Sequence, residues 1–355
     1  RDFTLQRSAD MVADGRVEHD TDDVETAYFD TAERDLHAYG MTVTRRVADD
    51  AEWVLTMPGN SAVLRFADST SVPEELAAIT HGVTAGRDLA HIATIRTLRD
   101  RYLVSDADGG PRLEIHDDEL RASLGDRLLA WREVHAAPAP ERLRERLSEA
   151  GARRATEPPR LHRVLAGDHA GPDTVTVAAG AQALDRYVAA QVDEIVRGDI
   201  ELRRGHDPIH DTRVAIRRLR STIRVFDELV DVFAEDDVAD VEADLKWFAG
   251  VLGEVRDCQV QQDRLGAALD ELPEELILGP VRARLRNDLK AVELPAREAV
   301  DEAMRSPRYA KMMSHLQVWR RRAPFHHWIE AAAVRRLANK AQRKARRRLA
   351  NALEA

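Results

Sequence analysis

Residues 210–224 read HDTRVAIRRLRSTIR, and this stretch decides how the second half of the chain folds. Side chains three and four residues apart return to one face of an α-helix, so a histidine and four arginines form a single stripe. These residues are His210, Arg213, Arg217, Arg220 and Arg224. The opposite face carries Ile216, Leu219, Ile223 and Phe226. The stretch therefore predicts an amphipathic bundle helix with one apolar and one cationic face.

The cationic stripe is interpreted as a phosphate-binding surface. Like charges at this spacing repel each other by a few tenths of a kcal/mol per pair, and a bound polyanion would remove that repulsion. The alternative is a solvated or salt-bridged face, because the chain has 63 acidic residues against 53 basic ones. Residues 212–226 contain no acid, so the stripe has no partner within its own helix. Asp207 and Pro208 precede it and suit a helix start.

A second basic segment, VRRLANKAQRKARRRL, occupies residues 334–349 and has eight Lys or Arg and no acid. Its helical spacing places Arg336, Lys340, Arg343 and Arg347 on one face. The two predicted cationic helices could then line the same channel. A disordered basic arm and a nucleic-acid patch remain open alternatives for this segment.

Residues 210–221, HDTRVAIRRLRS, and residues 245–260, LKWFAGVLGEVRDCQV, resemble the two best-marked segments of the CHAD domain, the conserved histidine α-helical domain. Arg218 falls on the first motif with the stripe residues, and Lys246, Arg256 and Asp257 fall on the second. Residues 306–316, SPRYAKMMSHL, resemble the start of a later family helix through Arg308 and Tyr309.

The CHAD resemblance covers roughly residues 174–349 and implies a helical bundle of two similar halves, whose basic residues line a central groove that binds inorganic polyphosphate. The polyphosphate-binding residues expected here are His210, Arg213, Arg217, Arg218, Arg220, Arg224, Lys246, Arg256, Arg308, Arg336, Lys340, Arg343 and Arg347. The family normally has a second His- and Arg-rich helix, related to the first by internal duplication. No such segment is found before residue 355, so either a C-terminal part is missing or the second half has degenerated.

The first 165 residues have a different pattern, in which apolar and polar residues alternate as in half-buried strands. Such stretches surround residues 43–47 and recur at 52–57, 62–66, 96–104, 112–115 and 128–134. Helices are expected near residues 72–80 and 141–150. Many short strands with few helices predict an antiparallel sheet or barrel, and the chain as a whole is expected to be α+β. A Pro- and Gly-containing stretch, residues 157–173, is the expected linker between domains at 1–165 and 174–355.

Residues 28–46, YFDTAERDLHAYGMTVTRR, with WVLTMPG at 53–59 and EPPRLHRVLAG at 157–167, look like a CYTH domain, the triphosphate tunnel fold. The resemblance implies an antiparallel tunnel, which in catalytic members holds a triphosphate with basic residues and a divalent metal with acidic ones. Here the alternating glutamates of the first strand are not visible in residues 1–11. Thr56 replaces a lysine, and the late Glu-x-Glu reads Glu133, Val134, His135. The tunnel is therefore expected to be degenerate.

Glu114 and Asp118, with Asp117, are the weak candidates for a metal site, since Mg²⁺ and Mn²⁺ favour hard oxygen ligands. No metal or other cofactor is expected unless the CYTH-like domain is active, in which case Mg or Mn would support triphosphate hydrolysis. A non-catalytic protein is the favoured interpretation, and a metal-dependent triphosphatase is the first alternative. Nucleic-acid backbone binding is the second, disfavoured because aromatics are 5% of residues and none interleaves with the basic stripes.

The formal net charge is −10, but the acid is concentrated at residues 10–25 and 227–244, so the basic stripes can still attract phosphate. The single cysteine, Cys258, rules out an intramolecular disulfide. No apolar run approaches the roughly twenty residues of a membrane span. These features favour a cytoplasmic protein without a membrane partner. The CHAD resemblance implies a role with polyphosphate, for which targeting to or scaffolding at polyphosphate granules is expected. The oligomeric state and the preferred polyphosphate length stay open.

Overall fold

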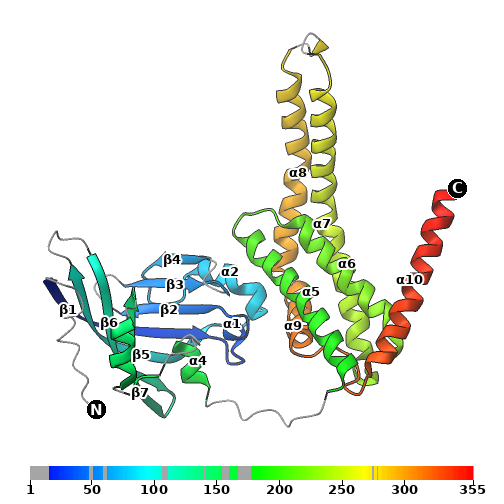
Figure 1. The fold of residues 1–355 in the computed structure, drawn as a ribbon. Helices are drawn as coiled ribbons and strands as arrows, with labels where there is room; N and C mark the ends of the chain where they lie inside the picture. The colour runs from blue at the N-terminus through cyan, green and yellow to red at the C-terminus, as the bar shows by residue number, and fades with distance from the viewer. Residues whose placement is uncertain are drawn as a thin grey trace. The chain divides into compact units, whose positions relative to one another are not determined.

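The computed structural model describes residues 16–47, 51–58, 62–105, 111–138, 141–149, 151–153, 160–166, 177–273, 276–277 and 279–354 (Figure 1). The chain divides into two compact units. The sheet unit comprises Arg1–Ala77 and Asp88–Pro172, and the helical unit comprises Ala78–Arg87 and Asp173–Ala355. Residues 1–11, where the CYTH opening signature was sought, and residues 167–173 of the expected linker lie outside the described residues.

The sheet unit is built on seven antiparallel strands in the order β4-β3-β2-β1-β5-β6-β7. The strands are β1 Arg16–Asp30, β2 Thr42–Val47, β3 Glu52–Thr56, β4 Val63–Ala67, β5 Ala90–Ser105, β6 Pro111–Leu124 and β7 Arg127–Ala137. The antiparallel sheet and the α+β class are confirmed. Among the described residues the sheet is open, with β4 and β7 as its edges, so closure into a tunnel is not seen there.

The central strand β1 was not anticipated, because its sequence, RVEHDTDDVETAYFD, reads as an acidic surface stretch. The structure pairs polar side chains of β1 with those of the neighbouring strand. Arg96 on β5 donates from Nε to Oδ1 of Asp23 on β1 at 2.9 Å. The His19 ring on β1 lies 2.8 Å from Oδ1 of Asp100 on β5. Cross-strand pairing thus compensates the charges that made this stretch look unlike a strand.

Two short helices cover opposite faces of the sheet at different places. Leu143 of α3 (Glu141–Glu149) packs in a cluster with Ile115 of β6. Leu161 of α4 (Arg160–Leu165) packs in a second cluster with Leu120 of β6. Ile115 and Leu120 are five residues apart, so they point to opposite faces of the strand. A further helix, α1 (Asp35–Ala38), follows β1, and the Asp30 carboxylate accepts hydrogen bonds from backbone N–H groups of Thr31, Leu36 and His37.

The helical unit is a bundle, as expected (Figure 1). Its helices are α5 Ala179–Arg203, α6 Ile209–Val225, α7 Glu235–Asp270, α8 Val281–Arg305, α9 Pro307–Arg321 and α10 Ala331–Glu354, with short 3-10 helices η3 Asp227–Leu229 and η4 Val232–Ala234. The buried core includes Leu219, Phe248 and Met312, and the Phe248 ring packs edge-on against Tyr309. Within the described ranges, no helix has both the length and the apolar content needed to cross a bilayer.

The helical unit also includes residues 78–87, which contain the end of α2 (Glu74–Thr84). Gly82 lies directly against the buried carboxylate of Asp199, leaving no room for a Cβ. That carboxylate also accepts from the Tyr309 hydroxyl at 2.8 Å and from Nε of Arg203 at 3.0 Å. Burial raises the pKa of Asp199, against the opposing effect of Arg203. Nothing in the sequence pattern indicates that α2 contributes to this core.

Candidate functional site

Helix α6 has the two faces that its sequence predicts. Ile216, Leu219 and Ile223 are buried, whereas the arginine stripe lies on the exposed and partly buried side. Thr212 near its start fits against Gly198 of α5, where no side chain could be accommodated. This close approach fixes the rotation of α6 and holds the stripe away from α5.

Arg213 is held by the backbone of α7. Its Nη1 donates to the carbonyl oxygen of Ala249 at 2.7 Å. The same guanidinium lies against Gly253, where a Cβ would collide with Nη1. Arg213 is therefore partly a packing residue, and its guanidinium is fixed in position before any ligand arrives.

At the other end of the stripe, α7 supplies an acidic partner. Nε of Arg224 donates to Oε1 of Glu242 at 2.6 Å, and Nη2 of Arg220 lies 3.5 Å from the same oxygen. Nε of Arg220 is buried and has no hydrogen-bond partner within the described part of the chain. Apart from Asp211 in its first turn, α6 contains no acid, and the acidic partner of the stripe comes from the neighbouring helix.

One side of α7 borders the arginine stripe. Glu242, Lys246, Ala249, Gly253 and Arg256 follow one another at spacings of four and three, so they share a face. Three of them contact α6 arginines, and this places Lys246 and Arg256 on the same border. We call this surface the α6–α7 face. Its cations are Arg213, Arg217, Arg220 and Arg224 from α6 with Lys246 and Arg256 from α7.

Several cations near this face are not neutralised. Arg217, Arg218 and Lys246 are exposed, and no carboxylate of the described residues forms an ion pair with them. Arg256 donates to Oε1 of Gln259 at 3.1 Å. His210 is exposed at the N-terminal end of the stripe. Unpaired cations on adjoining helix faces provide a locally positive surface on an acidic chain.

Arg308 lies on a different side of α7. Its Nε donates to Oδ1 of Asp244 at 2.6 Å, and its guanidinium lies 4.4 Å from the centre of the Trp247 ring. Asp244 is two residues from Glu242, which turns it by about 200° around the helix axis. Arg308 therefore does not join the α6–α7 face.

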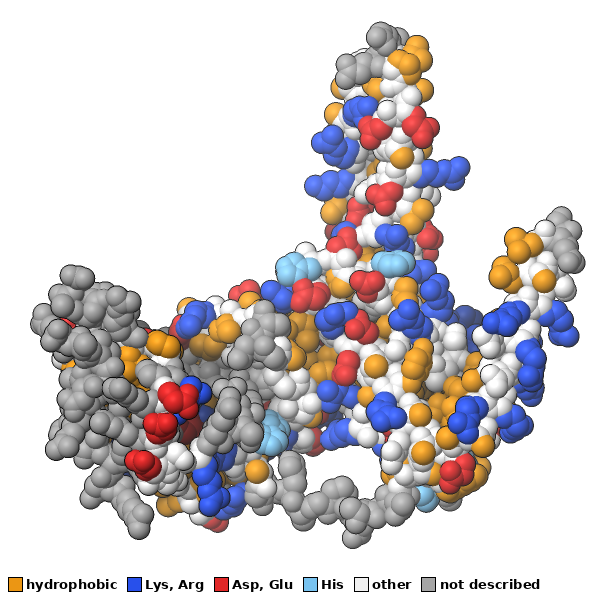
Figure 2. Space-filling model, viewed as in Figure 1, with side chains coloured by type: hydrophobic (Ala, Val, Ile, Leu, Met, Phe, Trp, Pro, Cys, Tyr) orange, Lys and Arg blue, Asp and Glu red, His pale blue; other side chains and the backbone are white. Residues whose placement is uncertain are grey.

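The cations of α10 form a third group, and Figure 2 shows Lys and Arg side chains along this helix. Leu337 is buried, but the residues beyond it are largely exposed. Arg336 lies 3.7 Å from Glu228, whereas Lys340, Arg343 and Arg347 have no ion-pair partner in the ranges that the structure covers. The cations expected to form one site are thus divided among three places. They lie on the α6–α7 face, beside Trp247 in the case of Arg308, and along α10.

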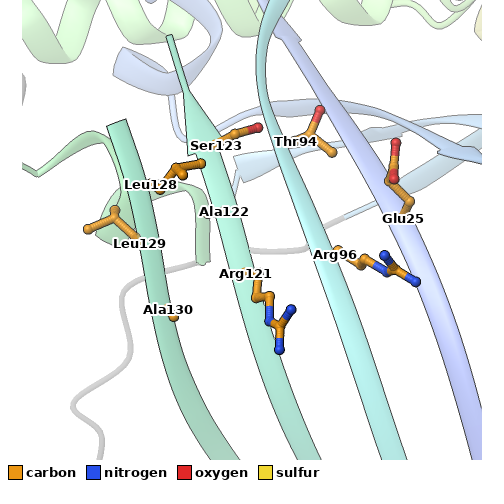
Figure 3. Close-up of a pocket in the computed structure, with 9 residues that line it drawn as sticks. All are labelled: Glu25, Thr94, Arg96, Arg121, Ala122, Ser123, Leu128, Leu129 and Ala130. Atoms are coloured by element: carbon orange, nitrogen blue, oxygen red, sulfur yellow. The ribbon is translucent and has the colours of Figure 1, made fainter. Parts of the chain in front are cut away.

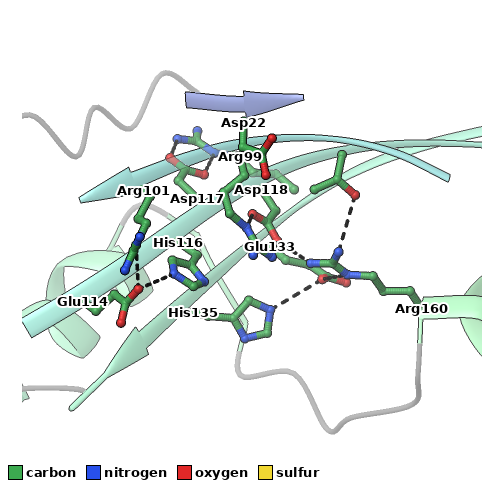
Figure 4. Close-up of polar contacts among 12 residues, drawn as sticks. Asp22, Arg99, Arg101, Glu114, His116, Asp117, Asp118, Glu133, His135 and Arg160 are labelled. Carbon is green, nitrogen blue, oxygen red and sulfur yellow. Dashed lines mark hydrogen bonds and ion pairs between the residues drawn. The ribbon is translucent and has the colours of Figure 1, made fainter. Parts of the chain in front are cut away.

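The sheet unit holds a separate polar network (Figure 4). The fully buried Asp118 accepts hydrogen bonds from Nε and Nη2 of Arg99 at 2.7 and 2.8 Å, and a further bond from Arg160. Nε of Arg160 also donates to Glu133 at 3.0 Å. Burial works to raise the pKa of Asp118, but the hydrogen bonds from the two arginines outweigh it and lower that pKa. Sequence reasoning identified Asp118 but missed Arg99 and Arg160.

The proposed metal ligands do not converge. Glu114 accepts from Nε of Arg101 at 2.7 Å and lies 2.9 Å from the His116 ring. Asp117 points to the opposite face of β6 from Asp118, where it pairs with Arg132. Within the described residues, no group of three or more His, Cys, Asp or Glu side chains is placed to hold a metal ion. These carboxylates fit ion pairing with arginine better than they fit a shared metal.

The face of the sheet opposite to Asp118 carries a pocket of about 370 Å³ (Figure 3). Arg96, Arg121 and Glu25 lie on three successive strands at one end, and Leu128 of β7 lies at the other. Arg96 is held by Asp23, and Arg121 is the second cation that lines the pocket. No motif in the sequence pointed to this pocket.

The fold of the helical unit is a bundle with a cationic surface on two of its helices, and the family comparison agrees with the helical part. Residues 186–355 match the model of the CHAD domain. The chain therefore carries a CHAD domain in its helical unit, and that expectation is confirmed. The antiparallel sheet before it is in keeping with the CYTH resemblance.

Two uncharacterized proteins of Mycobacterium tuberculosis are similar to most of this chain. They are MT2285 from strain CDC 1551 / Oshkosh and Rv2226 from strain ATCC 25618 / H37Rv, each 28% identical over 332 residues. The match covers 85% of this chain but 64% of each relative, so the chain spans about two thirds of their length or slightly less. PptA from Streptomyces chartreusis, a solved structure, is 26% identical with a TM-score of 0.41, covering 50% of this chain and 60% of its own. At that TM-score the likeness fixes neither the fold nor a ligand.

Proposed function

We propose that the CHAD domain binds inorganic polyphosphate on the α6–α7 face without catalysing a reaction. The observation that carries this proposal is the juxtaposition of Arg213 and Arg217 on α6 with Lys246 and Arg256 on α7. The contact of Arg213 with Ala249 and Gly253 brings these two cationic rows together. The unpaired state of Arg217 and Lys246 within the described chain leaves them available to an anion.

The residue types suit a flexible inorganic polyanion. A guanidinium offers a planar fork that can hold two phosphate oxygens and stays charged at any physiological pH. A chain of phosphates repeats its charge, so several modest contacts add up, and the release of counterions contributes as it does for nucleic-acid backbones. The cations of α10 would extend the contact for longer chains. We place the protein at polyphosphate granules in the cytoplasm, as a targeting or scaffolding component.

The test is calorimetric titration with polyphosphates of graded length, with and without Mg²⁺. Arg213→Glu with Arg217→Glu should abolish binding, but Arg213 also packs against α7, so a second pair is needed. Arg217→Glu with Lys246→Glu changes two exposed residues and should lower the affinity by at least about tenfold, because two attractive contacts become repulsive.

The matched control is Arg284→Glu with Arg286→Glu, which makes the same charge change at two exposed arginines of α8. It should keep wild-type affinity to within about threefold, as expected for charges beyond the screening length. Equal losses in both double variants would show that binding follows net charge and would contradict the site. A nucleic acid of equal charge that competes as well as polyphosphate would favour a nucleic-acid function.

A further inference from the structure

Glu242 sits among the cations of the α6–α7 face and binds two of them. We infer that Glu242 is an internal competitor of the ligand. It pairs with Arg220 and Arg224, so only an anion long enough to displace it gains affinity from these two arginines. This inference rests on the proposed polyphosphate site and concerns its selectivity.

The geometry resembles that of a bound anion. Two guanidiniums from successive turns of α6 approach one oxygen of Glu242, Arg224 at 2.6 Å and Arg220 at 3.5 Å. The carboxylate satisfies them incompletely, because Nε of Arg220 stays buried without a partner among the residues that the structure describes. A phosphate group offers more acceptor oxygens than a carboxylate, so a phosphate that displaces Glu242 can accept from both guanidiniums at once.

The pair is also weak enough to be displaced. The Arg224 side chain is 59% exposed and that of Glu242 is 28% exposed. Solvent and salt screen such a pair, and it shifts an equilibrium by no more than a few-fold. Displacing Glu242 therefore costs a ligand little binding free energy, and the displaced carboxylate can be solvated by water.

The position of Glu242 makes its effect depend on ligand length. Arg213 and Arg224 are eleven residues apart on α6, or about 16 Å along the helix axis. A short anion can bind Arg217 and Lys246 without reaching Arg224. A long chain that follows the whole stripe must displace Glu242 to use its last two arginines.

The experiment compares Glu242→Gln with Asp240→Asn. Asp240 lies on the same helix, two residues earlier, and pairs with Lys311 at 2.9 Å, so the control removes the same charge from the other side of α7. Long-chain polyphosphate and tripolyphosphate are titrated into wild type and both full-length variants at fixed pH and salt. We expect Glu242→Gln to raise the long-chain affinity by about two- to fivefold and the tripolyphosphate affinity by less than about twofold. Asp240→Asn should leave both within about twofold of wild type.

Two results would overturn the inference while leaving the proposed function intact. One is a Glu242→Gln affinity no higher than that of Asp240→Asn, and the other is an equal gain for both ligands. In either case Arg217→Glu with Lys246→Glu would still lower the affinity by at least about tenfold. Loss of the proposed function would look different, because wild type would then fail to bind polyphosphate of any length. Thermal unfolding of Glu242→Gln close to wild type would verify that the fold is retained.

Discussion

Arg213 shows how a single residue can serve both packing and binding. Its guanidinium is anchored by Ala249 and rests on Gly253, so the position depends on the absence of a side chain there. A larger residue would push the cation away without changing any charge. Arg220 and Arg224 differ from it, because their partner is the carboxylate of Glu242.

Gly253→Ala tests that anchoring. The added Cβ collides with the end of the Arg213 side chain, which can move, so the protein should fold and its polyphosphate affinity should fall by about three- to tenfold. Gly250→Ala is the matched control, because Gly250 is on the same helix with nothing within 4 Å of an added Cβ. Both variants gain about 0.5–1 kcal/mol of helix propensity. Titration and thermal unfolding are compared, and equal affinities for the two variants would contradict the anchoring role.

At the scale of elements, the α6–α7 contact is the decisive one. The three-and-four spacing in residues 210–224 correctly predicted a helix with a buried face and a cationic face. The spacing could not reveal that Glu242 of α7 lies beside its end, because a helix's own sequence does not specify its neighbour. Strand β1 was not predicted for a related reason. Its carboxylates become compatible with a sheet only when β5 supplies Arg96.

The segment at the end of α2 gives a second prediction at this scale. Gly82→Ala should destabilise the helical unit by about 1–3 kcal/mol, because the added methyl group meets the buried Asp199 carboxylate, which hydrogen bonds from Tyr309 and Arg203 hold in place. Gly266→Ala on α7 meets nothing within 4 Å and should not be destabilising. Chemical denaturation followed by circular dichroism measures both. An unchanged unfolding free energy for Gly82→Ala would mean that residues 78–87 are not part of the helical core.

For the whole molecule, binding to an acidic chain must depend on local charge. The formal net charge of −10 repels polyanions at long range, whereas the unpaired cations of the α6–α7 face attract them at short range. Both effects are sensitive to ionic strength, but the neutralisation of several cations by one ligand dominates at contact.

The affinity for long-chain polyphosphate should therefore fall steeply as salt rises. By analogy with nucleic acids, the logarithm of the association constant should decrease by about 0.7–0.9 per neutralised charge for each tenfold increase in salt. Four contacts, at Arg213, Arg217, Lys246 and Arg256, give a slope of about −3. Titrations at several salt concentrations measure this slope. A slope near zero would be incompatible with an electrostatic site.

The sequence alone determined the helical bundle, the antiparallel sheet and the cationic stripe of α6. These features follow from periodicity and motif, which are local properties of the chain. The tertiary structure decided which charges meet. It separated Arg308 from the stripe, saturated Asp118 with Arg99 and Arg160, and placed Glu242 against Arg220 and Arg224. Such pairings depend on how helices and strands rotate and pack against one another, and side chains distant in sequence become neighbours only through that packing.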